Sequence, residues 1–194
     1  MAPITVDIVS DNICPWCFVG KRRLEQAMKT FAGEQEFVVR WHPFQLNPAA
    51  PTVGVDKRMY YNEKFGEDKV KQLVPFMMET FSKVGINYTV EGLTGNTFDS
   101  HRLVAFAGHQ GPAVQDKLVE AIFKLYFEKG KYLGDKAVLR EAADQAGIEN
   151  AEEVIENEEV AKEEVQKAIK SLGSNVTGVP HYIINGKYHL SDFK

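Results

Sequence analysis

The sequence predicts an α/β fold in which strands from both ends of the chain share one sheet, with a block of helices inserted between them. Two patterns carry this prediction: a strand–helix–strand start within residues 4–44, and two short strands joined by Asn-Gly near the end of the chain. The 194 residues are 44% hydrophobic and 26% charged, which is typical of a globular protein long enough to bury a core.

The first unit is a strand, a turn and a helix, followed by a second strand. Residues 4–9 are rich in β-branched side chains and predict a strand. From Pro15 onward apolar side chains recur at helical spacing, and proline suits the first turn of a helix because its missing N–H costs nothing there. Residues 37–44 predict the second strand.

The middle of the chain is predicted to be mostly helical, and the strand pattern returns at the end. Glycines separate or follow helical segments at 56–65, 68–84, 99–110, 113–129, 136–146 and 157–172. The acidic run 149–164 is interpreted as a solvated helical face rather than a partner-binding tail. The strands of the final hairpin are expected at 182–184 and 187–190.

These elements divide the chain into three parts. Residues 1–48 and 174–194 are expected to form the N-terminal and C-terminal parts of the sheet domain. Residues 49–173 are expected to form the helical insertion and a helix that returns to the sheet.

Charge and hydropathy exclude several classes of protein. The formal net charge is −4, which argues against nucleic acid or an anionic membrane as a partner. Apolar runs are only a few residues long, whereas about 20 residues are needed to span a bilayer. The first residues lack the positive region of a signal peptide. We therefore expect a cytoplasmic protein that binds neither nucleic acid nor membrane.

The two cysteines, Cys14 and Cys17, are two residues apart and lie at the predicted strand-to-helix turn. A helix start favours a negative charge, so Cys14 is expected as a thiolate, while Cys17 would be more buried and stay a thiol. At this spacing Cys14 can attack a disulfide and Cys17 can resolve the mixed disulfide. Pro15 and Trp16, between them, would tune the redox potential.

Three other uses of a cysteine pair are weaker interpretations. A structural zinc site normally has four ligands, and none of the five histidines lies at a short ligand-like spacing from another. A disulfide that closes a loop of two residues adds little stability. Covalent haem would require histidine at position 18, which is Phe18. We therefore expect no metal site and no required cofactor.

The chain resembles the DsbA-type branch of the thioredoxin superfamily, represented by FrnE-like oxidoreductases. That branch is related to 2-hydroxychromene-2-carboxylate isomerases and kappa-class glutathione transferases. The resemblance spans nearly the whole chain and rests on residues 10–21, 95–103, 123–130 and 177–185. It implies a thioredoxin-like fold with an inserted helical domain.

The resemblance also implies roles for particular residues. Cys14 would be the nucleophile and Cys17 the resolving thiol. Pro180 would match the cis-proline that faces the cysteines, with the Val179 backbone pairing to an extended substrate.

Three further positions are candidates with structural alternatives. Asn96 and His101 match positions near the active-site mouth. The structural alternatives are Asn96 or Thr97 as a helix N-cap and His101 as a packed or exposed helix residue. A buried Asp7, on the first strand, could accept a proton from Cys17, and an edge-facing or loop-proximal Asp7 is the alternative.

Two departures from the relatives matter. Cys14 stands where the isomerase and transferase relatives typically have serine, which favours dithiol exchange. The relatives continue past the hairpin with a turn and a final helix, whereas this sequence stops at Lys194, so the fold is predicted without that helix. An uncovered sheet face favours self-association, and a homodimer or a partner is one expectation.

The sequence therefore predicts a thiol–disulfide oxidoreductase for protein or small-molecule disulfides, with glutathione as the expected exchange partner. Two alternatives stay open. One is a glutathione-dependent isomerase or transferase acting on an aromatic or polyketide-like compound, which should not need Cys17. The other is a non-catalytic peptide-binding module or holdase that uses the Val179–Pro180 groove.

Overall fold

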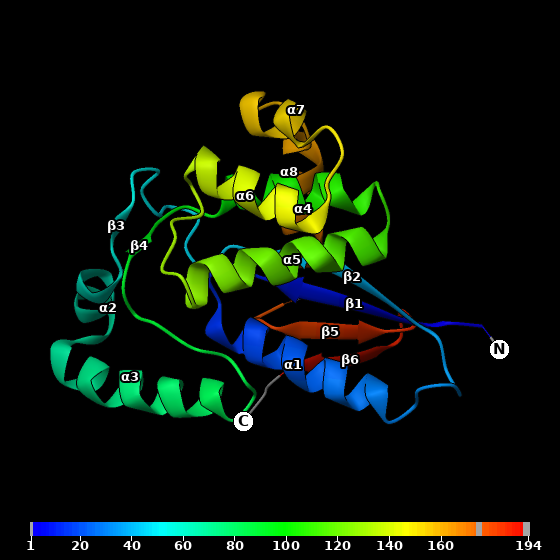
Figure 1. The fold of residues 1–194 in the computed structure, drawn as a ribbon, viewed down its shortest axis with the longest axis horizontal. Helices are drawn as coiled ribbons and strands as arrows, with labels where there is room; N and C mark the ends of the chain where they lie inside the picture. Colours follow the sequence, from blue (N-terminus) through cyan, green and yellow to red (C-terminus); the bar gives the residue numbers. More distant parts are fainter. Residues whose placement is uncertain (1, 174–175, 192–194) are drawn as a thin grey trace.

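A four-stranded sheet forms the centre of the protein, as the computed structural model shows for residues 2–173 and 176–191 (Figure 1). The strand order is β2 (Phe37–Pro43), β1 (Ile4–Ser10), β5 (His181–Ile184) and β6 (Tyr188–Ser191). β1 pairs with β2 in parallel and with β5 antiparallel, and β5 and β6 form an antiparallel hairpin. The prediction that strands from both ends of the chain share one sheet is confirmed.

Helix α1 (Pro15–Lys29) connects the parallel strands β1 and β2. Its first turns are buried, and Cys17 and Phe18 join Val6 and Ile8 of β1 in the main core. The ring of Phe18 stacks at 5.0 Å from that of Phe123, so the start of α1 is packed between the sheet and the helical block.

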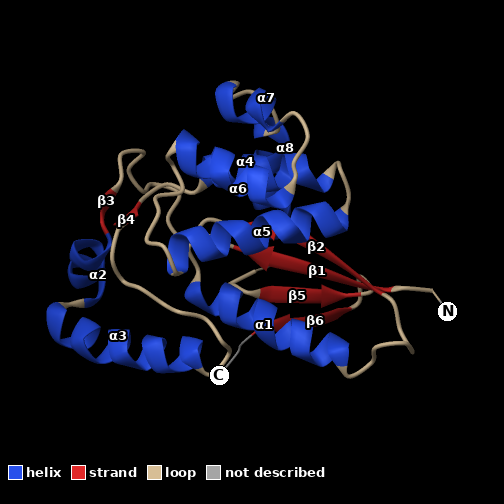
Figure 2. Ribbon diagram, in the orientation of Figure 1, coloured by secondary structure: helices blue, strands red, loops and turns tan. Residues whose placement is uncertain are grey.

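The segment between β2 and β5 holds the other described helices and a short two-stranded sheet (Figure 2). The helices are α2 (Lys57–Phe65), α3 (Glu67–Ser82), α4 (Phe98–Gly108), α5 (Pro112–Phe127), α6 (Lys136–Ala146), α7 (Ala151–Glu156) and α8 (Lys162–Gly173). The small sheet pairs β3 (Val55–Asp56) with β4 (Leu93–Thr94). In Figure 1, α2 and α3 form an arm beyond the end of the sheet at which α1 begins.

Most predicted helices are confirmed, and one is corrected. The bounds of α6 are those predicted, and α2 to α5 lie within two residues of the prediction. The predicted helix 157–172 is wrong in its first turn, because Asn157 is extended and Ala161 has a φ of 58°, so α8 begins at Lys162. Helix α7 and the small β3–β4 sheet were not predicted.

The acidic run 149–164 is solvated, as predicted, but it does not form one helical face, because residues 157–161 lie between α7 and α8. Glu152 and Glu156 of α7 are exposed and pair with Arg140 of α6, while Val154 and Ile155 are buried. Helix α7 therefore keeps its acidic side chains in solvent and its two aliphatic side chains in the core.

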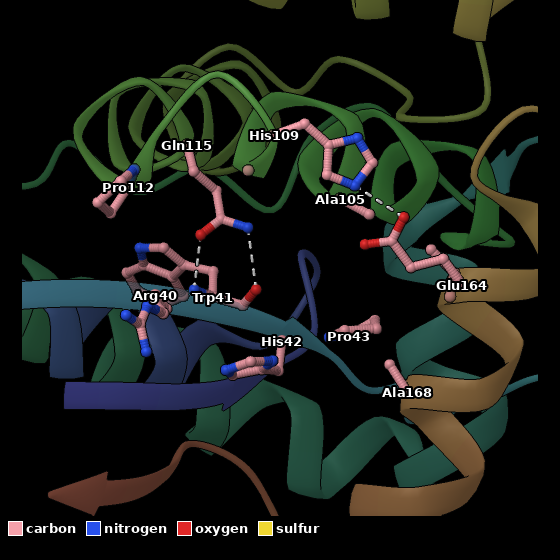
Figure 3. Close-up of a pocket in the computed structure, with 12 residues that line it drawn as sticks. Arg40, Trp41, His42, Pro43, Ala105, His109, Pro112, Gln115, Glu164 and Ala168 are labelled. Atoms are coloured by element: carbon pink, nitrogen blue, oxygen red, sulfur yellow. Dashed lines mark hydrogen bonds and ion pairs between the residues drawn. The ribbon is translucent and has the colours of Figure 1, made fainter. Parts of the chain in front are cut away.

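Helix α5 holds the edge strand β2 in place. Gln115 of α5 accepts a hydrogen bond from the Trp41 backbone N–H at 2.9 Å and donates one to its carbonyl at 3.1 Å (Figure 3). The Trp41 indole also donates to Asp116 at 2.9 Å. An edge strand exposes unpaired backbone groups, and here a glutamine side chain satisfies two of them.

Two expectations fall outside the described residues. One is the start of the C-terminal sheet part at residue 174. The other is the absence of a final helix, which concerns the residues after 191. Within residues 2–173 and 176–191, no helix combines the length and apolar character needed to cross a bilayer.

Candidate active site

Both cysteines lie at the start of α1, where the strand-to-helix turn was predicted. Cys14 is the N-cap residue, and its N–H donates to the Asp11 carbonyl at 3.0 Å. Both thiols are free, and the exposed fractions are 3% for Cys14 and 0% for Cys17. Cys14 therefore lies at the helix start and Cys17 one turn further in, and both side chains are buried.

The loop before β5 faces the first cysteine. The Cys14 thiol donates a hydrogen bond to the Val179 carbonyl at 3.5 Å, across 165 residues of sequence. The Val179–Pro180 peptide bond is cis, and Pro180 is buried. The structure thus brings together the four residues Cys14, Cys17, Val179 and Pro180 that the resemblance had placed in one site.

The second cysteine is held as a thiol. Burial raises the pKa of Cys17 well above its usual value, and the neighbouring Cys14 adds to the increase. The Ser10 hydroxyl and the Asp11 backbone act in the opposite direction, without outweighing burial. Cys17 is therefore a protonated thiol at neutral pH.

Asp7 does not lie beside the cysteines. Successive side chains of a strand point to opposite faces, so Asp7 lies on the face opposite to Val6 and Ile8, which pack with Cys17. Its carboxylate lies 2.8 Å from His42 Nε2. The groups that lower the Cys17 pKa are the Ser10 hydroxyl and the Asp11 backbone, not Asp7.

Asn96 fastens the loop that precedes α4. Its side-chain oxygen accepts from the Phe98 N–H at 2.8 Å, and its side-chain nitrogen donates to the Pro48 carbonyl at 3.0 Å. Asn96 thus makes a local capping contact, and Thr97, the other expected N-cap residue, occupies the N-cap position of α4.

His101 lies beneath the active-site turn and is 2% exposed. Its Nε2 is 3.3 Å from Asp11 Oδ1, and its Nδ1 is 3.4 Å from Asn12 Nδ2. It reaches the cysteines only through this turn, so its place is that of a packed helix residue with polar partners.

The sequence analysis missed the role of Asp11 and Asn12. Asp11 is fully buried and accepts the Leu46 N–H at 2.7 Å, while Asn12 donates to Ser100 at 2.8 Å. The available signal was the polar run Ser10–Asn12 directly before Cys14, since polar residues at a buried turn need partners.

A cavity of about 400 Å³ opens beside Cys14, between the start of α1 and the arm formed by α2 and α3. Its walls are mainly aromatic and aliphatic, and the aromatic side chains are Trp16, Tyr60, Tyr61, Phe65 and Tyr126. Such a cavity is suited to the apolar part of a substrate that reacts with the Cys14 sulfur.

A second cavity, of about 230 Å³, lies between β2 and helices α4, α5 and α8 (Figure 3). His109 and Glu164 form an ion pair of 3.0 Å at its side, and none of the predicted site residues lines it. Over the described ranges, no group of three His, Cys, Asp or Glu side chains is placed to hold a metal ion.

The sheet order, the cysteine pair at the start of α1 and the facing cis-proline define a thioredoxin-fold protein. The chain belongs to the DSBA-like thioredoxin domain family, which matches residues 5–193. The predicted DsbA-type resemblance and thioredoxin-like fold are confirmed.

Known proteins of similar fold carry several activities. The chain is 26% identical to a structure described as a "probable DsbA oxidoreductase" from Streptomyces coelicolor, with a TM-score of 0.87 over 97% of this chain and 83% of that one. It is 26% identical to YwbO of Bacillus subtilis over 93% of this chain and 86% of the relative.

Two more distant structures share the fold. A 2-hydroxychromene-2-carboxylate isomerase has a TM-score of 0.71 at 15% identity, covering 96% of this chain and 87% of its own. The cytosolic disulfide reductase DsbM from Pseudomonas aeruginosa, solved with GSH, has a TM-score of 0.60 at 15% identity, covering 96% and 89%.

Proposed function

We propose that the protein is a thiol–disulfide oxidoreductase in which Cys14 attacks a disulfide and Cys17 resolves the product. The observation that carries the proposal is the hydrogen bond of 3.5 Å from the Cys14 thiol to the Val179 carbonyl. Cys17 is buried one helical turn further along the chain. Cys14 is 3% exposed but lines an open cavity at the helix start, and the second thiol is buried behind it, as two-step exchange requires.

The first step forms a bond from the Cys14 sulfur to one sulfur of the substrate disulfide and releases the other as a thiolate. In the second step Cys17 loses its proton and attacks Cys14, releasing the remaining thiol and leaving a Cys14–Cys17 disulfide. Two electrons pass from the protein to the substrate, and the reverse sequence oxidises a dithiol. An extended substrate would lie along the Val179 backbone.

Glutathione is the proposed exchange partner and the cytosol the proposed compartment. Support comes from the fold shared with DsbM, which is described as cytosolic and was solved with GSH.

The test is an equilibrium titration against reduced and oxidised glutathione, with free thiols alkylated and counted by mass. We expect a reversible two-electron transition in the wild type. The Cys17→Ser variant should accumulate a glutathione adduct on Cys14, because the resolving thiol is absent.

Cys14→Ser is the matched control and should form no adduct. A pair that stays unreactive across the whole range of ratios would overturn the proposal. Isomerisation that survives Cys17→Ser would favour the glutathione-dependent isomerase, and peptide binding that survives Cys14→Ser would favour the binding module.

A further inference from the structure

We propose that Cys14 attacks the disulfide of a small aromatic carboxylic acid. The aromatic ring occupies the cavity beside Cys14, and Lys64 and Lys69 bind the carboxylate. The inference rests on the proposed thiol–disulfide exchange and specifies its substrate class. Three features of the described residues carry it: the shape of the cavity, its aromatic walls and the two cations among its lining residues.

The cavity is continuous with the reacting sulfur. Cys14, Pro15 and Trp16 form one wall, and α2 and α3 supply the opposite wall. Met77 of α3 and Tyr126 of α5, among the lining residues, are 4% and 1% exposed, so the cavity reaches the main core. A volume of about 400 Å³ seats a ring system with its substituents, and falls within the usual range for small-molecule sites.

The walls favour an aromatic group. Tyr60, Tyr61 and Phe65 of α2 line the cavity together with Trp16. The rings of Tyr61 and Phe65 are 5.9 Å apart in an edge-on arrangement, and those of Tyr60 and Tyr61 are 6.2 Å apart. A planar group placed among such rings gains edge and face contacts in addition to its buried area.

Two lysines supply positive charge at the cavity. Lys64 Nζ lies 5.5 Å from the ring centroids of both Tyr60 and Phe65, and Lys69 Nζ lies 5.9 Å from the Phe65 ring. Both side chains are exposed, and both residues line the cavity.

These two cations have no acidic partner at the cavity. No Asp or Glu is among its described lining residues, and the nearby carboxylates of Glu67 and Asp68 pair with Lys71 instead. Apolar rings with unneutralised ammonium groups are complementary to an aromatic anion, since the ring is desolvated while the carboxylate is met by charge.

The reaction balances without another reactant. The Cys14 thiolate attacks one sulfur of the aryl disulfide, and one aryl thiolate leaves. Cys17 then loses a proton and displaces the second aryl thiolate from Cys14. One disulfide is consumed and one is formed, so two electrons pass to the substrate.

The experiment compares four disulfides with the reduced full chain in rapid-mixing kinetics. The probes are dithiobis(nitrobenzoate), an aromatic dianion; dithiodipyridine, which is aromatic and uncharged; dithiodipropionate, an aliphatic dianion; and hydroxyethyl disulfide, aliphatic and uncharged. Each rate is divided by the rate of the same probe with free mercaptoethanol, which removes the intrinsic reactivity of the probe.

We expect the aromatic dianion to have the highest normalised rate. The Lys64→Gln, Lys69→Gln double variant should lower the ratio of the aromatic dianion to the uncharged aromatic probe by about fivefold, as loss of two surface charges would. Phe65→Leu should lower the normalised rates of both aromatic probes and leave the aliphatic probes unchanged.

Lys71→Gln is the matched control. It removes a lysine from the same arm, but Lys71 is paired and does not line this cavity, so the ratio should not change. Comparing ratios within one variant also cancels any change in the reactivity of Cys14.

Other results would overturn the inference. If the double variant and Lys71→Gln give the same ratio as the wild type, the lysines do not select the substrate. If a cysteine-disulfide peptide, added as a fifth probe, has a higher normalised rate than the aromatic dianion, the substrate is a polypeptide. If no disulfide reacts at all, the proposed exchange fails as well, which distinguishes the two failures.

Discussion

Gly20, one turn after Cys17, lets the hairpin approach the thiols. A Cβ at this position would collide with the Tyr182 hydroxyl and come within 3.3 Å of Pro180 Cγ. A glycine inside a helix costs about 1 kcal/mol relative to alanine. Here that cost is offset by close packing between α1 and the loop whose carbonyl meets Cys14.

We expect Gly20→Ala to lower the free energy of unfolding by about 1–3 kcal/mol and to slow disulfide exchange, because Tyr182 and Pro180 must move. Urea unfolding and exchange kinetics measure the two effects. Gly178→Ala is the control, since a Cβ there meets no atom within 4 Å. Equal stability of both variants and the wild type would contradict the crowding argument.

Lys57 is a buried cation that the exchange mechanism does not use. It is 0% exposed, its Nζ donates to the Tyr126 carbonyl at 3.1 Å, and it lies 3.8 Å from the centroid of the Tyr126 ring. Burial lowers its pKa from 10.5 to about 8, with Glu91 acting weakly in the opposite direction.

This lowered pKa predicts a pH-dependent stability. Between about 8 and 10.5 the unfolded chain binds more protons at Lys57 than the folded one, so its contribution to stability rises with pH. The free energy of unfolding of the wild type minus that of Lys57→Met should increase by up to about 3 kcal/mol across this window. Urea unfolding at several pH values measures the difference, and a flat difference would contradict the prediction.

At the scale of elements, a cluster of ion pairs joins α1 to α5. Lys21 is 3% exposed and lies 3.1 Å from Asp116 and 3.4 Å from Glu120. Arg22 donates to Glu120 at 2.9 Å. Burial works against the charge of Lys21, but the surrounding carboxylates outweigh it and raise its pKa. The cluster therefore fixes the helix that carries both cysteines against the helical block.

Acid should weaken this junction. Burial opposes the ionised form of Glu120, but Arg22 and Lys21 outweigh it and lower its pKa from 4.5 to about 2. Its contribution to stability is complete above pH 4.5 and is lost as the pH falls towards 2. Glu120→Gln should therefore cost up to about 3 kcal/mol at neutral pH and much less near pH 2.

Unfolding of both proteins followed by circular dichroism across this pH range checks the prediction. Glu141→Gln is the control, because Glu141 is exposed and contacts only Gln145 among the described residues. A loss of stability in Glu120→Gln that does not depend on pH would show that its charge is not the cause.

At the scale of the whole molecule, Asp11 connects three separate segments. Its carboxylate accepts the Leu46 N–H at 2.7 Å and lies 3.3 Å from His101 Nε2, while its carbonyl accepts the Cys14 N–H. The loop after β2, helix α4 and the active-site turn thus meet at one buried side chain. The helical insertion is held to the cysteines through this contact.

We expect Asp11→Ala to lower the free energy of unfolding by about 2–4 kcal/mol, because it leaves the Leu46 N–H and the buried His101 without their partner. It should also slow attack by Cys14 on dithiodipyridine, since the turn is no longer fixed. Asp68→Ala is the control, because its carboxylate is exposed and pairs only with Lys71 within the described chain. Unchanged stability of Asp11→Ala would contradict this role.

Local patterns determined most of the elements and the position of the cysteine pair. Strand alternation, helical spacing and the Asn-Gly turn act over a few residues, so β1, α1, β2, the β5–β6 hairpin and helices α2 to α6 could be predicted. The breaks at Asn157 and Ala161 were missed, because this segment makes a tertiary contact that local spacing does not encode. Arg102 of α4 donates to the carbonyls of Asn157 and Val160.

Only the tertiary structure decided how these parts form a site. The contact of Cys14 with Val179 joins residues 165 positions apart, and the cavity beside it is closed by α2 and α3 from the insertion. The sheet register places the Asp7 carboxylate beside His42. The side chain that contacts Cys17 is instead that of Ser10. Such contacts depend on which faces pack together, which no local spacing encodes, whereas the chemistry of the two thiols was already present in the sequence.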